Sequence, residues 1–134
     1  MVIVNLRDFS FDYNPKVPPG RVVFRFFNVG RATHVPSLIP LDEDFPPIDQ
    51  QLRGAERRVA SPFGGLRNRF PGQSGTFAVD LEAGHRYALI CFAVDPDKTL
   101  HRLKGMTSEF RAGGGKPGPR PSAPAGIPQQ TPNG

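Results

Sequence analysis

Residues 21–28 read RVVFRFFN, the clearest strand signal in the chain. The side chains alternate with a period of two, so Val22, Phe24 and Phe26 share one face of an extended segment. Branched and aromatic side chains favour strands, and the preceding prolines and Gly20 indicate a turn. We therefore predict a half-buried β-strand at this position.

Several shorter segments repeat this pattern along the chain. Strand-like runs lie at residues 2–6, 9–13, 76–81, 87–94 and 107–111, and the proline-containing run 33–41 reads as an edge strand or an irregular crossing segment. The short connection at residues 82–85 predicts that the runs on either side of it form a hairpin. Seven or eight short strands favour an all-β Greek-key β-sandwich, because a parallel α/β architecture would need helices between most strands.

Two segments depart from the strand pattern. Pro46 and Pro47 can open a short helix over residues 47–59, in which the apolar side chains share one face. Residues 113–134 are rich in glycine and proline and hold a single aliphatic side chain larger than alanine. Such a segment buries too little apolar surface to offset its chain entropy. We therefore predict one β-sandwich domain over residues 1–112, followed by a disordered tail.

The charge of the chain bears on its partners rather than on its fold. The formal net charge is +5 over 134 residues, and the isoelectric point is about 10.0. This balance favours an acidic protein partner or an anionic surface. No stretch approaches the roughly 20 apolar residues of a membrane span, so none is predicted. Nucleic-acid binding is not predicted either, because the aromatic side chains of residues 21–28 are needed for the core and no recognition motif accompanies them.

The sequence lacks the motifs of the common enzyme classes. It has no phosphate-binding glycine loop, no paired catalytic carboxylates and no Ser-His-Asp arrangement in a supporting context. We therefore predict that the protein is not an enzyme.

Four side chains offer soft metal donors, in the order His34, Cys91, His101 and Met106. A thiolate, two imidazoles and a thioether suit one copper ion that cycles between Cu(I) and Cu(II). Each residue alone has a plainer interpretation: the cysteine as a small buried hydrophobe, the methionine as a core filler, and the histidines as hydrogen-bonded or surface residues. Their conjunction on a β-sandwich pattern favours ligation.

These residues also carry a family likeness, because the chain resembles the cupredoxins, the small blue copper proteins. The likeness covers residues 2–111. It rests on FRFFN followed by a glycine and His34, on PGQSGTFAVDLEAG, on a tyrosine ahead of Cys91, and on HRLKGM at residues 101–106. The resemblance implies one bound copper ion, whose ligands would be His34, Cys91, His101 and Met106.

The resemblance further implies one-electron transfer to a redox partner protein, for which the basic charge favours an acidic surface. Because the family is mostly exported, it implies a periplasmic or extracellular location, with an export signal removed ahead of Met1. We expect a monomer. Two alternatives remain: a metal-free cupredoxin-like binding module that uses residues 53–69 or the tail as its contact surface, and a copper storage or delivery protein with the same ligands.

The link between Cys91 and His101 tests the copper interpretation. Its nine residues exceed the link of the familiar electron carriers and resemble that of some bacterial cupredoxin-like domains. A regular hairpin with a four-residue loop would put the thiol and the imidazole on opposite sides of the sheet. A three-residue loop would place them directly opposite each other, and an irregular loop or a bulge would also allow a shared ion. Copper binding therefore predicts that this connection is not a plain even-length hairpin.

Overall fold

Two four-stranded sheets make up the fold in the computed structural model, which describes residues 1–48, 50 and 64–118. The first sheet has the order β2 (Ser10–Asp12), β1 (Val2–Arg7), β3 (Gly20–Asn28), β6 (Ser74–Leu81). The second has the order β5 (Gly64–Gly65), β4 (Pro36–Leu41), β7 (Arg86–Cys91), β8 (Thr107–Arg111), and a single 3-10 turn, η1 (His101–Lys104), precedes β8. The predicted all-β sandwich is confirmed.

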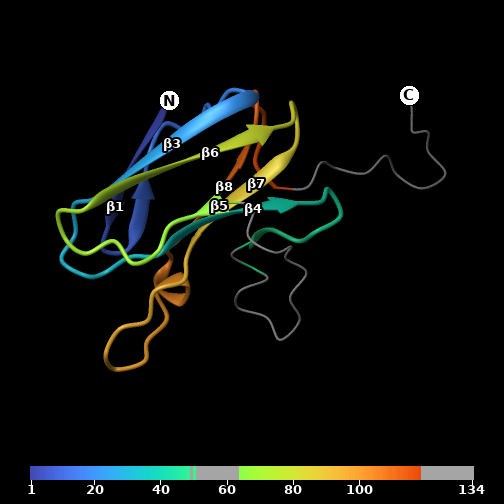
Figure 1. The fold of residues 1–134 in the computed structure, drawn as a ribbon. Helices are drawn as coiled ribbons and strands as arrows, with labels where there is room; N and C mark the ends of the chain where they lie inside the picture. The colour runs from blue at the N-terminus through green and yellow to red at the C-terminus, as the bar shows by residue number, and fades with distance from the viewer. Residues whose placement is uncertain (49, 51–63, 119–134) are drawn as a thin grey trace, which may run out of the picture.

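The core lies between the two sheets, which form separate layers in Figure 1. Val22, Phe24 and Phe26 of β3 are buried, as their shared face predicted. They meet Leu89 of β7 and Phe110 of β8 in one apolar cluster, in which the Phe24 and Phe110 ring centroids are 6.1 Å apart. The alternation read from the sequence thus placed the core face of the central strand correctly.

The predicted hairpin across residues 82–85 is wrong. β6 pairs with β3 in the first sheet, whereas β7 pairs with β4 and β8 in the second, so this connection crosses between the layers. All six residues of β7 are buried, since its inner face fills the sandwich and its outer face is covered as well. A short polar connection and alternating strands look the same in both topologies, so the local pattern could not distinguish them.

The proline-containing run holds strand β4, whose neighbour β5 pairs with Ser37 and Leu38 alone. The outer face of β4 and β7 carries a second buried cluster in which Ile39 and Ile90 pack against Ile48. The helix predicted over residues 47–59 lies almost entirely outside the described residues.

The end of the described chain is tied to the sandwich. The Gly113 N–H donates to the Val17 carbonyl, and the Arg111 guanidinium donates to the Lys116 and Gly118 carbonyls. The remainder of the predicted tail, residues 119–134, lies outside the described residues, and the domain division remains a prediction. Among the described residues, no helix is long and apolar enough to cross a membrane.

Candidate metal centre

His34 is positioned by the turn that follows β3. The Asn28 amide donates to the Ala32 carbonyl at 2.8 Å and to the Arg69 carbonyl at 2.7 Å. His34 and Arg69 exchange both main-chain hydrogen bonds, at 3.1 and 2.7 Å. The side chain of Asn28 therefore holds the loop that carries the histidine.

Cys91 is the last residue of β7, and the segments on both sides of it fix its position. Its N–H donates to the Met106 carbonyl at 3.2 Å, which continues the pairing with β8. The Val35 N–H points at the Cys91 Sγ, 3.4 Å away. The sulfur thus lies against the backbone beside His34.

His101 begins η1, at the end of a loop that leaves the sheet after Cys91. The His101 N–H donates to the Ala93 carbonyl at 3.1 Å, and Val94 and Leu100 form an isolated bridge. The turn closes at Gly105, whose φ of 94° is in the left-handed region. The link is therefore not a plain hairpin, as copper binding required. Its pairing matches neither the three-residue loop nor the four-residue loop considered from the sequence. The connection is instead an irregular loop.

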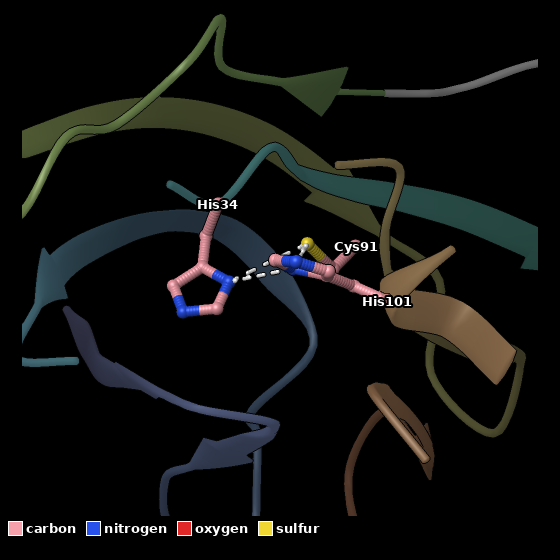
Figure 2. Close-up of side chains that lie close together, drawn as sticks. All are labelled: His34, Cys91 and His101. Atoms are coloured by element: carbon pink, nitrogen blue, oxygen red, sulfur yellow. Dashed lines mark hydrogen bonds between the residues drawn. The ribbon is translucent and has the colours of Figure 1, made fainter. Parts of the chain in front are cut away.

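Three candidate donors converge at this end of the sandwich (Figure 2). The His34 Nδ1 lies 3.2 Å from the His101 Nδ1, and the Cys91 Sγ lies 3.7 and 3.6 Å from these two nitrogens. All three side chains are at most 1% exposed, and the donor atoms lie within 4.8 Å of one another. Residues separated by up to 67 positions in sequence thus form one compact donor triangle.

This donor triangle has the dimensions of a metal site. A triangle with these edges has its centre about 2.0 Å from each corner, close to the bonds of about 2.0–2.1 Å to imidazole nitrogen and about 2.3 Å to thiolate that a first-row ion such as zinc makes. A thiolate with two imidazoles in a trigonal arrangement is typical of copper electron-transfer sites. The residues present therefore fit a single copper ion.

Solved structures share this architecture. Dithionite-reduced auracyanin from the photosynthetic bacterium Roseiflexus castenholzii superposes with a TM-score of 0.56 and 19% sequence identity over 82% of this chain and 94% of that chain. Auracyanin B gives a TM-score of 0.56 and 17% identity over 83% of this chain and 86% of that one. The chain has the cupredoxin fold. No family model and no curated protein matches it.

Met106, the fourth residue that the cupredoxin resemblance implied, is fully buried. Main-chain hydrogen bonds join it to two of the three donor residues: its N–H donates to the His101 carbonyl at 3.3 Å and its carbonyl accepts from Cys91. The left-handed turn at Gly105 directs the chain from η1 back into β8. Ligation by the Met106 thioether remains a prediction.

Burial sets the protonation of the metal-free donors. Burial raises the pKa of the Cys91 thiol, and this outweighs the lowering by the backbone hydrogen bonds of Val35 and Ala93. Burial also lowers the pKa of His34, although the hydrogen bond to Asp8 opposes it. At neutral pH the pocket therefore holds a protonated thiol and a neutral His34, and metal binding must release the thiol proton.

Two carboxylates that the sequence did not single out contact the imidazoles from behind. The His34 Nε2 is 2.8 Å from the Asp8 Oδ1, and the His101 Nε2 is 2.5 Å from the Asp95 Oδ1. In the sequence Asp8 lies between the strand-like runs 2–6 and 9–13, and Asp95 lies in the link between Cys91 and His101. No spacing rule links either one to its histidine, so the sequence carried no signal for these contacts.

The surface beside the donor triangle is hollowed and partly apolar. A depression of about 840 Å³ is lined by Phe9, Phe70, Phe92, Val94 and other residues of the same loops. Phe70 and Val94 are each 53% exposed and Phe92 is 37% exposed. The rim of the donor end therefore offers apolar side chains to a docking protein.

Proposed function

We propose that the protein is a mononuclear copper electron carrier of the cupredoxin type. The observation that carries this proposal is the convergence of the His34, Cys91 and His101 donors into a buried triangle that fits one ion. Met106 is the proposed axial ligand. A copper ion held there would supply one-electron chemistry by changing between Cu(I) and Cu(II).

The chain's own groups keep the donor positions fixed during electron transfer. Cys91 is held within the sheet ladder, and its sulfur accepts a hydrogen bond from the Val35 N–H. Phe9 packs edge-on against both imidazoles, with ring centroids 6.3 Å from His34 and 4.8 Å from His101. A site that cannot relax needs little rearrangement when the charge of the ion changes, so electron transfer is fast.

Burial favours a retained cofactor over copper storage or delivery. All three donor side chains are at most 1% exposed, so a competing ligand cannot reach the site without opening the loops. Because neither imidazole is exposed, electrons cannot leave directly from a histidine ring at the surface. We infer that electrons leave through the residues that line the depression.

For the partner we propose an acidic redox protein that docks on this rim. We further propose that the carrier is a monomer. The apolar side chains at residues 70, 92 and 94 supply the contact area, and Arg31 lies on the same rim. The net charge of +5 steers an acidic partner toward the protein. An exported location, periplasmic or extracellular, suits such an exchange.

A titration with Cu(II) tests the proposal. The purified protein should bind one equivalent and develop an intense visible band from thiolate-to-copper charge transfer. Cys91→Ser should abolish the band, and His101→Ala should weaken or shift it. His85→Ala is the matched control, because His85 lies in the connection between β6 and β7, and it should leave the band unchanged. A colourless protein whose thiol reactivity is unaltered by copper would contradict the proposal and favour the metal-free binding module.

A further inference from the structure

Each histidine of the donor triangle uses both ring nitrogens. The Nδ1 atoms face each other and Cys91, whereas the Nε2 atoms meet carboxylates that come from two different loops, Asp8 before β2 and Asp95 after β7. The two rings are 0% and 1% exposed, so water cannot replace these carboxylate contacts. Each histidine of the donor triangle thus has one carboxylate on the side of its ring that faces away from the triangle.

We propose that Asp8 and Asp95 are paired positioning residues that fix both imidazoles for metal binding and hold the reduction potential of the bound ion low. The inference rests on the proposed function for its redox part. Its structural part, the selection of one tautomer, applies to the metal-free protein as well.

The tautomer follows from the chemistry of the carboxylates. An ionised carboxylate only accepts hydrogen bonds, so each Nε2 must carry the proton and donate it. The Nδ1 lone pair of a neutral ring then points into the donor triangle, where the metal needs it. The two Nδ1 atoms lie 3.2 Å apart, and the Cys91 thiol, which carries a single proton, can donate it to only one of them. A metal ion that replaces this proton would bind both lone pairs and the sulfur.

Both carboxylates are themselves held in place. Asp8 accepts hydrogen bonds from the Arg31 N–H at 2.8 Å and the Ala32 N–H at 3.1 Å. A side chain at Gly30 would collide with the Asp8 carboxylate, so the approach requires glycine there. Although its partial burial opposes the shift, these amides and His34 keep the pKa of Asp8 below its ordinary value. Asp8 is therefore placed as a hydrogen-bond acceptor toward the His34 ring.

Asp95 has a different support. It accepts a hydrogen bond from the Lys104 ammonium at 2.6 Å, and Lys104 also lies 4.3 Å from the centre of the Phe9 ring. The hydrogen bonds from Lys104 and His101 lower the pKa of Asp95. Because the lysine charge offsets that of Asp95 whereas Asp8 is bonded by neutral amides, Asp8 should influence the ion more strongly.

The effect on the ion follows from charge. A carboxylate behind an imidazole makes the ring a stronger donor and places negative charge near the site. Both effects stabilise Cu(II) more than Cu(I), because the oxidised ion carries the greater positive charge. Removing either carboxylate should therefore raise the reduction potential.

The test measures the potential and the copper affinity of Asp8→Asn and Asp95→Asn. The matched control is Asp80→Asn, which removes the same charge from an exposed pair with Arg21 at the far end of β3 and β6. Each site variant should lose Cu(II) affinity by about 10–100-fold and Cu(I) affinity by less. Every tenfold preferential loss of Cu(II) raises the one-electron potential by about 59 mV. Asp8→Asn should shift the potential further than Asp95→Asn.

Nitrogen chemical shifts of the histidines in the metal-free protein give a second readout that needs no copper. In the unmodified protein His34 and His101 should both show the proton on Nε2, and in Asp8→Asn the preference of His34 should weaken. Protons on Nδ1 of both rings, or potentials of the two site variants equal to that of Asp80→Asn, would overturn the inference while leaving copper binding intact. A protein that binds no copper but shows both Nε2 protons refutes the proposed function and retains the tautomer selection.

Discussion

Arg86 and Glu109 form a buried, two-pronged ion pair across strands β7 and β8. The Arg86 Nε and Nη2 each donate to a different oxygen of Glu109, both at 3.1 Å, and the two side chains are 0% and 8% exposed. The same guanidinium donates to the carbonyls of Asp42 and Phe45 at 2.6 and 2.7 Å. One side chain thus fastens the segment after β4 to the second sheet.

Removing one member of this pair should be costly. Arg86→Met leaves the Glu109 carboxylate and the loop carbonyls without their donor, which should lower the free energy of unfolding by about 3–5 kcal/mol. The double variant Arg86→Met with Glu109→Leu should lose clearly less than the sum of the two single losses, because no unpaired charge stays buried. Chemical denaturation of the four proteins gives this coupling energy. If the losses of the two single variants add up to that of the double variant, Arg86 and Glu109 do not stabilise each other.

The left-handed glycine between the proposed ligands His101 and Met106 should matter for the site as well as for stability. A Cβ at Gly105 would meet no atom within 4 Å, so Gly105→Ala acts through its φ of 94° alone and should cost about 1–2 kcal/mol. Copper affinity should fall too, because the strain is relieved by moving η1. Isothermal titration with copper measures this loss.

Gly20 offers a matched control for Gly105. Its φ is 91°, it is equally open, and it lies at the start of β3, at the opposite end of that strand from Asn28. Gly20→Ala should lose a similar free energy of unfolding and keep its copper affinity. Equal copper affinities for the two alanine variants would show that the turn at Gly105 does not affect copper binding.

The two tyrosines should make the protein sensitive to alkali. Burial raises the pKa of both Tyr13 and Tyr87 above the ordinary value of 10.0. The unfolded chain then loses these protons first, so the stabilisation is complete below about pH 10 and is lost as the pH rises toward the folded-state pKa values. Unfolding measured from neutral pH into this range should show the decline.

Phenylalanine variants show how much each tyrosine contributes to the loss of stability at alkaline pH. The Tyr13 hydroxyl is 2.7 Å from the Ser108 Oγ and joins the segment after β2 to β8, so Tyr13→Phe should cost about 1 kcal/mol at neutral pH. It should also remove part of the alkaline slope, and Tyr87→Phe should remove a further part. The remainder belongs to Cys91, whose pKa burial also raises. A slope that is unchanged in the double variant would show that the tyrosines are not responsible.

The proposed ligation by the Met106 thioether predicts a change in potential without a loss of fold. Leucine has nearly the same volume, so Met106→Leu should cost less than about 1.5 kcal/mol. Loss of the thioether removes a weak donor that stabilises Cu(II), so the potential should rise and the visible spectrum should change. Voltammetry and absorption of the copper-loaded variant measure both. An unchanged potential would make Met106 a core residue only.

The sequence by itself determined most of the strands and the order of the donor residues. Alternation along residues 21–28 placed Phe24 and Phe26 in the core, and the run 107–111 matches β8 residue for residue. These features are local: the period of two expresses the two faces of one strand, whatever its neighbours are.

Only the tertiary structure decided how those pieces meet. The crossing from β6 to β7, the irregular loop that aims His101 at Cys91, and the carboxylates behind both imidazoles depend on contacts between segments far apart in sequence. Asp8 and His34 are 26 positions apart and lie on separate loops, so no periodicity relates them. The packing of the two sheets brings these loops to the same end of the molecule, and only there do the Asp8 carboxylate and the His34 ring meet.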